Sequence, residues 1–300
     1  SNNDPRDLGR LGNYFDIIVV DAPCSGSGLF RREPDAIDEW SEAAVHLCSQ
    51  RQQRILADVW PSLKKNGILI YSTCSYSQEE NEDIVSWMCR EFAVDSLPLS
   101  ITDSPGIVQT KTGEKLAYGY RFYPDKVKGE GFFISCVKKK EGGEFFFPRA
   151  GNQSLTKLSK KETAHITNYI KRDLFLIFFI HDGLVNALPA SLERDLIYLR
   201  TVLYLKKAGV LLGKLIGKEL VPDHQFGLST LINPEWPSIA VNLEEAIKYL
   251  QKEELNLDSF FRGWVLLRYK NQNLGWIKIL KDRINNYYPK EWRILKKENN

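Results

Sequence analysis

The sequence has no apolar run long enough to cross a membrane. Its longest apolar run extends only from Leu174 to Ile180, whereas a membrane-spanning helix needs about 20 apolar residues. No apolar signal region follows Ser1. We therefore expect a soluble protein without a membrane partner and, because the chain does not begin with Met, a fragment excised from a longer one.

Cysteine is scarce, and its spacing does not suggest pairing. The chain has five cysteines, an odd number, and no two of them have CxxC spacing. This pattern fits neither a disulfide framework nor a zinc site, and it predicts a reducing, cytoplasmic setting with no metal. A glycine-rich dinucleotide loop is lacking too, since "GSG" at 26–28 is followed by Arg31 where the fingerprint has its third glycine.

Positive charge is concentrated at one end of the chain. The net charge is +3, but residues 261–300 hold ten Lys or Arg against three acidic residues, which gives 10 − 3 = +7 there. The remainder therefore carries +3 − 7 = −4. A basic end on an acidic body is typical of a nucleic-acid-binding appendage, although a solvated tail would have the same composition.

The first half of the chain alternates strand and helix patterns. "FDIIVVD" at 15–21 predicts a strand of a parallel sheet, and apolar residues at helical spacing predict a helix over 45–63 that ends at "KKNG". "ILIYS" at 68–72 predicts the next strand, and "GFFISCVK" near 131–138 a later one. This order predicts an α/β domain over 1–140, a linker over 141–155 and a second region over 156–300.

A further helix is expected between these strands. Ser77 and Glu80 have the S-x-x-E spacing of a capping box, which predicts a helix that begins near Ser77.

Two cysteines follow strands that should end at one edge of the sheet. Ligands of open α/β sheets bind at the carboxyl ends of parallel strands, so Cys24 and Cys74 should lie near each other. Cys74 also precedes the capped helix, whose dipole can stabilise a nearby thiolate. Cys48, Cys89 and Cys136 fall within helix or strand patterns, where buried cysteine commonly packs as a small apolar residue.

These motifs resemble those of a known enzyme family. "DAPCSGSG", "YSTCS", "EENE" and "RFYPDKVKGEGFFISCVKK" are similar, in order, to motifs of the RNA cytosine-5 methyltransferases of the Sun (Fmu) type. "VPDHQFGLS", "EEAIKYLQ" and "GWVLLRY" resemble the PUA-like end of the bacterial small-subunit rRNA branch. The resemblance implies a Rossmann-like class I methyltransferase sheet, followed by an α+β module that ends in a PUA-like fold from about residue 205.

The resemblance also implies a chemistry for the two thiols. Cys74 would add to C6 of cytosine, so that C5 can attack the methyl group of S-adenosylmethionine, and Cys24 would assist product release. Asp21 and Pro23 would lie beside the cofactor and the target base. The substrate would be RNA, with ribosomal RNA favoured and transfer RNA open.

One motif of the family does not occur in the chain. The glycine-rich "D-x-x-A-x-P-G-G-K" pattern is lacking, and by the family's strand order the chain corresponds to strands four to seven of the sheet. We therefore expect strand 15–21 to form an exposed apolar edge, and we expect this chain alone to bind the cofactor weakly and to be inactive.

The second region carries the expected RNA contacts. Asp182-Gly183 lies between two apolar runs and predicts a hairpin, Asn242 and Glu245 predict a capped helix, and "GWVLLRYKNQNLGWIKIL" predicts two strands around a polar turn. Most of the tryptophans are expected in the core, and His224 is expected to be structural. The cations expected to meet RNA phosphates are Arg31, Arg32, Lys278, Arg283, Lys290 and Arg293.

Two other classes are compatible with the sequence. A non-catalytic RNA-binding or ribosome-assembly protein would share the basic end but would not need the thiol pair. A cysteine hydrolase would need a histidine partner, and none of the four histidines lies in a recognisable pairing context.

Overall fold

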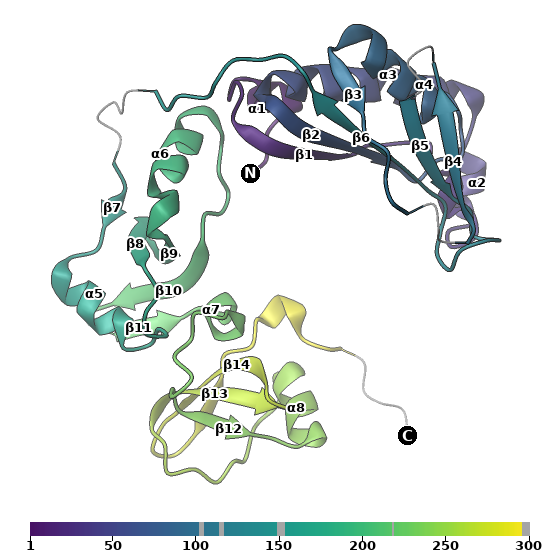
Figure 1. Ribbon diagram of the computed structural model, residues 1–300. Coiled ribbons are helices and arrows are strands. Elements are labelled where there is room, and N and C mark those ends of the chain that lie inside the picture. Colours follow the sequence, from purple (N-terminus) through teal and green to yellow (C-terminus); the bar gives the residue numbers. More distant parts are fainter. Residues whose placement is uncertain (102–104, 114–116, 149–153, 218, 296–300) are drawn as a thin grey trace. The chain divides into compact units, whose positions relative to one another are not determined.

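The computed structural model describes residues 1–101, 105–113, 117–148, 154–217 and 219–295 (Figure 1). The chain forms two compact units. Residues 1–149 and 199–204 make the first, and residues 150–198 and 205–300 make the second. Among the described residues, no helix is long and apolar enough to cross a membrane.

The first unit is built on a mixed sheet with strand order β1-β2-β6-β5-β4, and β3 pairs with β6. β1 and β2 are parallel, and β6, β5 and β4 follow in antiparallel pairing. The strand–helix–strand unit expected at the start of the chain is therefore confirmed. The strands are β1 (Phe15–Asp21), β2 (Leu63–Thr73), β3 (Val94–Ser96), β4 (Ile107–Thr112), β5 (Ala117–Phe122) and β6 (Phe132–Lys139).

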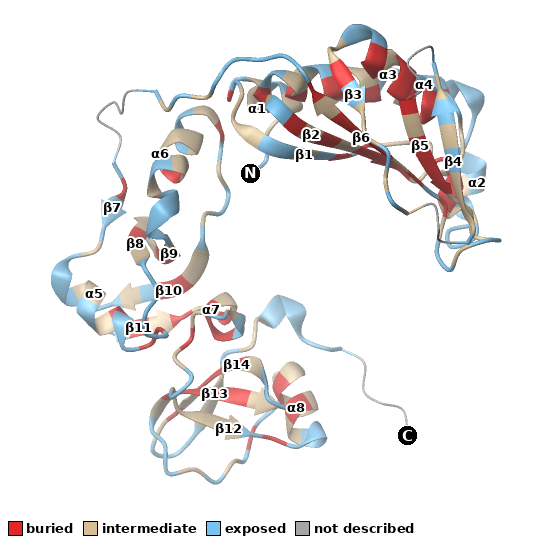
Figure 2. Ribbon diagram, viewed as in Figure 1, coloured by how far each residue is buried: buried red, intermediate tan, exposed pale blue. Residues whose placement is uncertain are grey.

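Helices and short turns connect these strands. Apolar side chains of α3 and α4 join those of β2 and β6 in one core, which includes Leu56, Leu69, Met88 and Phe133. Buried residues are found along all four of these elements (Figure 2). The helices are α1 (Pro5–Gly9), α2 (Asp35–Glu39), α3 (Glu42–Val59) and α4 (Glu82–Glu91), with 3-10 turns at Ser27–Leu29 and Trp60–Ser62.

The predicted end of the first long helix was wrong. α3 ends at Val59, and "KKNG" at 64–67 lies inside β2 rather than at a helix terminus. Pro61 explains the difference, because proline lacks the N–H that would continue a helix. The chain instead passes through a 3-10 turn at Trp60–Ser62, and Leu63 already pairs with Phe15 of β1.

The predicted start of α4 was also wrong. The helix begins at Glu82 after Asn81, and no side chain caps it, so Ser77 and Glu80 do not form the expected capping box. Glu80 is fully buried. Its carboxylate turns toward the loops that carry the two cysteines.

β1 forms an edge of this sheet, as the strand order shows. Ile17 and Val19 are 57% and 63% exposed, whereas Ile18 and Val20 pack on the core. One face of the strand is therefore an uncovered apolar surface in the described chain.

The second unit contains two sheets. The first has the order β11-β10-β9-β8-β7, and the second has the order β12-β13-β14-β15. The strands are β7 (Thr156–Lys157), β8 (Leu176–His181), β9 (Leu184–Pro189), β10 (Val210–Ile216), β11 (Glu219–Pro222), β12 (Ser238–Ala240), β13 (Gly263–Tyr269), β14 (Gln272–Ile279) and β15 (Ile284–Asn286). The helices are α5 (Lys160–Thr167), α7 (His224–Leu228), α8 (Leu243–Leu250) and the part of α6 (Glu193–Val202) that precedes Leu199, with 3-10 turns at Ala190–Leu192 and Lys290–Trp292.

The local predictions for this unit are confirmed. Asp182 and Gly183 both have positive φ and join β8 to β9 in a tight hairpin. Asn242 and Glu245 form a complete capping box at α8. Residues 263–279 form the antiparallel pair β13 and β14, whose turn is made by Lys270 and Asn271.

One apolar core connects the two sheets of the second unit. It contains Leu212 of β10, Phe226 of α7, and Trp264 and Trp276 of β13 and β14. Both tryptophans are therefore core residues, as expected, whereas Trp292 is 58% exposed.

Candidate active site

Cys24 and Cys74 meet at the carboxyl ends of β1 and β2. The two strands are parallel and in register up to Asp21 and Ser72, so the chain leaves both at the same edge of the sheet. The two Sγ atoms are 3.0 Å apart, and both side chains are only partly buried. The structure thus brings together two free thiols that are separated by 50 positions in the sequence.

The environment gives the two thiols opposite acidities. The hydrogen bond with Cys24 is the main cause that lowers the pKa of Cys74, from 9.0 to about 7. The same hydrogen bond, together with burial, raises the pKa of Cys24 far above its ordinary value. Near neutral pH, Cys74 is therefore ionised to a much greater extent than an ordinary cysteine, and Cys24 is a thiol that donates its proton toward it.

Asp21 and Pro23 lie in the loop that leads to Cys24. The Asp21 side chain is exposed and accepts a hydrogen bond of 3.1 Å from the Ser72 hydroxyl. Its negative charge opposes the formation of a thiolate at Cys74, so the carboxylate lies near that sulfur. The Pro23 carbonyl accepts a hydrogen bond of 3.0 Å from the Gln52 amide.

The loop that carries Cys24 contacts the Cys74 loop through Gly28, and the segment before β6 contacts Gly28 in turn. The Gly28 N–H donates to the carbonyl of Cys74 at 2.7 Å, and the Gly131 N–H donates to the carbonyl of Gly28 at 3.2 Å. A Cβ atom on Gly28 would collide with the Cys74 carbonyl oxygen, so this close approach requires glycine. Backbone contacts thus fix the loop of Cys24 directly against the loop of Cys74.

Sequence reasoning missed the polar network beneath the thiols. Glu80 accepts hydrogen bonds from Ser25 and Ser75, each of which directly follows one of the two cysteines. Gln52 connects the network to α3. The "EENE" motif marked this segment, but its spacing from Ser77 suggested a helix cap instead.

The other three cysteines do not join this site. Burial raises the pKa of Cys48 and of Cys136. Cys89 is buried within α4 and belongs to the core. These positions agree with a packing role.

The predicted RNA-contacting cations occupy different environments. Arg31 donates to the Gly129 carbonyl and to Glu130, and Arg32 pairs with Glu33, although both side chains remain more than half exposed. Lys278 is only 22% exposed and pairs with Glu219 at 2.6 Å. Arg283, Lys290 and Arg293 are exposed.

Exposed aromatic side chains accompany the last three cations. Trp292 and Tyr287 are 58% and 38% exposed on the same segment. His224 lies behind them, buried, with its ring edge-on to Tyr288 and Trp292. No cluster of three or more metal-ligating side chains occurs in the part of the chain that the structure describes.

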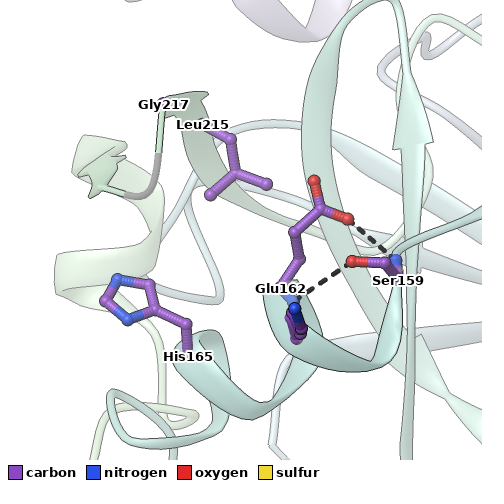
Figure 3. A pocket seen from close by; sticks show the side chains of 6 residues that line it. Ser159, Glu162, His165, Leu215 and Gly217 are labelled. Atoms are coloured by element: carbon purple, nitrogen blue, oxygen red, sulfur yellow. Dashed lines mark hydrogen bonds between the residues drawn. The ribbon is translucent and has the colours of Figure 1, made fainter.

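A separate pocket of about 670 Å³ lies beside α5 in the second unit (Figure 3). Ser159 and Glu162 line it and form the capping box of α5. His165 and Leu215 lie on its other sides, and the Nε2 atom of His165 has no hydrogen-bond partner among the described residues. The pocket contains none of the predicted RNA-contacting cations.

Comparison with known families identifies the first unit. Residues 2–138 match the family described as "16S rRNA methyltransferase RsmB/F". These residues are thus similar in sequence to RsmB/F methyltransferases. Residues 237–294 match the "Methyltransferase RsmF PUA domain", so the chain combines an RsmB/F methyltransferase domain of mixed-sheet fold with a PUA-like domain at its C-terminal end.

Curated relatives match almost the whole length of the chain. The chain is 27% identical over 302 residues to "Ribosomal RNA small subunit methyltransferase F" of Shewanella piezotolerans, covering 96% of this chain and 61% of that protein. It is 28% identical to the protein of the same name from Aliivibrio fischeri, covering 94% of this chain and 60% of the relative. The chain thus spans about three fifths of the length of these RsmB/F relatives.

Solved structures of related sequence are also found. "The crystal structure of NSun6 from Pyrococcus horikoshii with SFG" is 31% identical with a TM-score of 0.40, covering 47% of this chain and 34% of that chain. "Crystal Structure Analysis of Methyltransferase Homolog Protein from Pyrococcus Horikoshii" is 35% identical with a TM-score of 0.36, covering 46% and 43% of the two chains.

The acidity of Cys74 can be tested on this chain directly. Cys24→Ala is expected to raise the pH at which Cys74 is alkylated at half its maximal rate, from about 7 toward 9.0. The reason is the loss of the hydrogen bond that stabilises the thiolate. At pH 7, alkylation by iodoacetamide should slow by about five- to tenfold, since the smaller thiolate fraction outweighs the higher nucleophilicity of a more basic thiolate.

The measurement is the rate of alkylation of the peptide that contains Cys74, followed by mass spectrometry across a pH series. Cys136→Ala removes a buried thiol from β6 and serves as the control, with no shift expected. An unchanged pH midpoint in Cys24→Ala would show that Cys24 does not set the acidity of Cys74.

Proposed function

We propose that the protein methylates C5 of cytosine in RNA, with S-adenosylmethionine as the methyl donor and small-subunit ribosomal RNA as the substrate. The Cys24–Cys74 pair carries this proposal, because it places a thiolate and a thiol 3.0 Å apart at the ligand-binding edge of the sheet. The names of the RsmB/F relatives support the choice of ribosomal RNA. We place the reaction in the cytoplasm, where both thiols stay reduced.

In this mechanism, Cys74 is the nucleophile. Cytosine C5 is a poor nucleophile until a thiolate adds to C6, and the lowered pKa of Cys74 supplies that thiolate near neutral pH. The new S–C6 bond leaves electron density at C5. Covalent catalysis thus replaces one difficult substitution with two easier steps.

Cys24 acts in the second half of this mechanism. After C5 has gained its methyl group, a base removes the C5 proton, the C5=C6 double bond re-forms and the S–C6 bond breaks. The electron pair of that bond returns to the sulfur of Cys74. A Cys24 S–H group that donates to this sulfur stabilises the departing thiolate, so it favours product release.

Asp21 and Pro23 are the residues proposed to hold the methyl donor. The exposed Asp21 carboxylate lies near Cys74 at the end of β1, so its charge fits a cationic sulfonium group. Asp and Glu side chains can also accept a hydrogen bond from the cytosine N4 amino group. When bound there, S-adenosylmethionine supplies the electrophilic methyl group.

We propose that residues 156–300 bind the RNA, after a linker over 141–155 that follows the methyltransferase domain of 1–140. The PUA-like fold is proposed to extend from about residue 205. Leu212 and Phe226 share a core with Trp264 and Trp276, and Ile166 and Val185, which precede residue 205, belong to the same core. In the first unit, Arg31 and Arg32 are exposed and can reach phosphates beside the target base.

The proposed activity is tested by mass spectrometry of digested RNA. The assay uses a longer protein. It joins this chain to the part of a curated relative that lies outside the region matched by this chain. Small-subunit ribosomal RNA incubated with S-adenosylmethionine should gain 5-methylcytidine, whereas a transfer RNA pool should not. Methylation of transfer RNA alone would contradict the substrate, and binding without any methylation would favour a non-catalytic RNA-binding protein.

The RNA-binding role predicts a strong dependence on salt. Charge reversal of Arg283, Lys290 and Arg293 to Glu should weaken binding of structured RNA at least tenfold at low salt and reduce the slope of affinity against salt concentration. Each lost phosphate contact releases one counterion fewer. Filter binding of this chain over a salt series measures both quantities.

Lys248→Glu is the control for this prediction. The Lys248 side chain is 42% exposed in the same unit, but it lies on α8 and already pairs with Glu244 at 2.7 Å. The single reversal should change affinity only slightly. Equal affinity of the triple variant and the unaltered chain would contradict the RNA-binding role of this surface.

A further inference from the structure

One buried carboxylate contacts both cysteine loops. Glu80 is fully buried. Its Oε1 atom accepts from the Ser25 N–H at 2.8 Å and from the Gln52 amide at 3.2 Å. Its Oε2 atom accepts from the hydroxyls of Ser25 at 2.5 Å and of Ser75 at 2.6 Å. Because Ser25 follows Cys24 and Ser75 follows Cys74, this side chain bridges the two segments that carry the thiols.

The segment around Glu80 is itself fixed to β2. The Tyr71 hydroxyl donates to the Glu80 carbonyl at 2.6 Å, and the Gln52 side-chain oxygen lies 3.0 Å from the same hydroxyl as an alternative acceptor. The Thr73 hydroxyl donates to Asn81 at 2.6 Å, and Asn81 donates to the carbonyl of Ser75 at 2.8 Å. The carboxylate is therefore held from below by the same strand that positions Cys74.

The geometry points to Glu80 as a positioning residue that holds Cys24 and Cys74 within hydrogen-bonding distance of each other. The effect of this positioning on catalysis rests on the proposed function, but the positioning itself does not depend on that function. The hydrogen-bond partners of the Glu80 carboxylate do not include the sulfur of Cys24 or of Cys74. Glu80 therefore acts on the two cysteines through Ser25 and Ser75.

The carboxylate, rather than an amide, is required by the donors around it. A buried carboxylate is costly unless hydrogen bonds compensate it, and four donors converge on Glu80. A glutamine would offer only one acceptor oxygen and would direct an NH₂ group at one pair of donors. Glu80→Gln is thus expected to release at least one of the two loops from the network.

The distance between the thiols can be measured by oxidation of this chain. Diamide accepts two electrons and two protons from the Cys24 and Cys74 thiols, becomes the corresponding hydrazine and leaves an S–S bond between them. Sulfur atoms 3.0 Å apart should form this bond rapidly. Peptide mapping by mass spectrometry identifies the 24–74 linkage by the loss of two hydrogens and separates it from any linkage to the other cysteines.

Glu80→Gln should slow the 24–74 linkage at least tenfold. It should also shift upward the pH at which Cys74 is alkylated at half its maximal rate. The hydrogen bond from Cys24 is the largest cause that lowers the pKa of Cys74, so its loss outweighs removal of the Glu80 charge, which raises that pKa. A role in stability alone would lower the melting temperature without changing either reading. Both readings are therefore taken well below the melting temperature of every variant.

Ser86→Ala is the matched control. Ser86 is also buried, lies in α4 and shares a hydrogen bond of 2.8 Å with Thr112, away from the thiols. This variant should lower the melting temperature while the linkage rate and the pH midpoint stay unchanged. If Glu80→Gln does not fold, the double variant Ser25→Ala/Ser75→Ala removes both hydroxyl contacts to the carboxylate and should slow the linkage in the same way.

Two outcomes would overturn the inference. One is a linkage rate and pH midpoint in Glu80→Gln equal to those of the unaltered chain. The other, if that variant is unfolded, is an unchanged rate in the double serine variant. A slowed linkage together with no methylation of any RNA would instead leave the positioning role in place and reject the proposed function.

Discussion

Cys74→Ala is expected to abolish both methylation and any covalent complex with RNA. Without the Cys74 thiolate no bond to C6 forms, so C5 is never activated. The rate should fall by on the order of 10⁴-fold or more, the size of loss that follows removal of a catalytic nucleophile. The variants are made in the longer protein of the methylation assay, because this chain alone is expected to be inactive. Incorporation of labelled methyl groups into small-subunit ribosomal RNA measures the rate, and a denaturing gel detects the complex.

The fold should survive this substitution. Cys74 is only partly buried, and replacing its S–H group with hydrogen leaves a small cavity. The free energy of unfolding is therefore expected to fall by about 1 kcal/mol or less. Cys136→Ala, in the buried part of β6, is the control for loss of a thiol and should keep its activity. If Cys74→Ala retained more than a tenth of the activity, Cys74 would not be the nucleophile.

Cys24→Ala is expected to trap the enzyme on its product. Cys74 can still add to C6, but its sulfur then lacks the hydrogen bond that stabilises it as a leaving thiolate. A denaturation-resistant protein–RNA complex should accumulate during incubation with donor and substrate, while turnover falls by roughly 10²-fold or more, as for loss of a proton-donating group.

The comparison of the two variants separates catalysis from packing. If both cysteines only packed, both variants would show modest rate loss and a lower melting temperature, and neither would form a complex. If the complex formed in Cys74→Ala and disappeared in Cys24→Ala, the roles of the two thiols would be exchanged while covalent catalysis itself would stand.

Much of the fold followed from local sequence patterns. The β-branched run ending at Asp21 predicted β1 with its observed bounds. Asp182-Gly183 predicted the turn between β8 and β9, and Asn242 with Glu245 predicted the start of α8, because both features depend on residues close in sequence. The convergence of Cys24 and Cys74 was predictable too. It depends only on two parallel strands that end at one edge.

The wrong start of α4 has a tertiary cause. Ser77 and Glu80 have the spacing of a helix cap, but the cysteine loops present buried N–H and O–H donors that only a carboxylate satisfies, and this tertiary demand overrides the local preference. Partners such as Ser25 lie 55 positions away from Glu80, so no local pattern could reveal them. The ion pair between Lys278 and Glu219 joins residues 59 positions apart, so no local pattern could reveal it either, and the RNA contact expected of Lys278 stays a prediction.

The most direct test of the account locates the covalent bond to RNA in both variants by tandem mass spectrometry of digested complexes. The account predicts that Cys24→Ala carries a cytidine nucleotide with one extra methyl group on Cys74, and that Cys74→Ala carries no nucleotide. Two results would contradict the roles of Cys74 as nucleophile and Cys24 as the group that aids product release. One is a nucleotide bound to Cys24 in Cys74→Ala, and the other is an unmethylated nucleotide bound to Cys74 in Cys24→Ala.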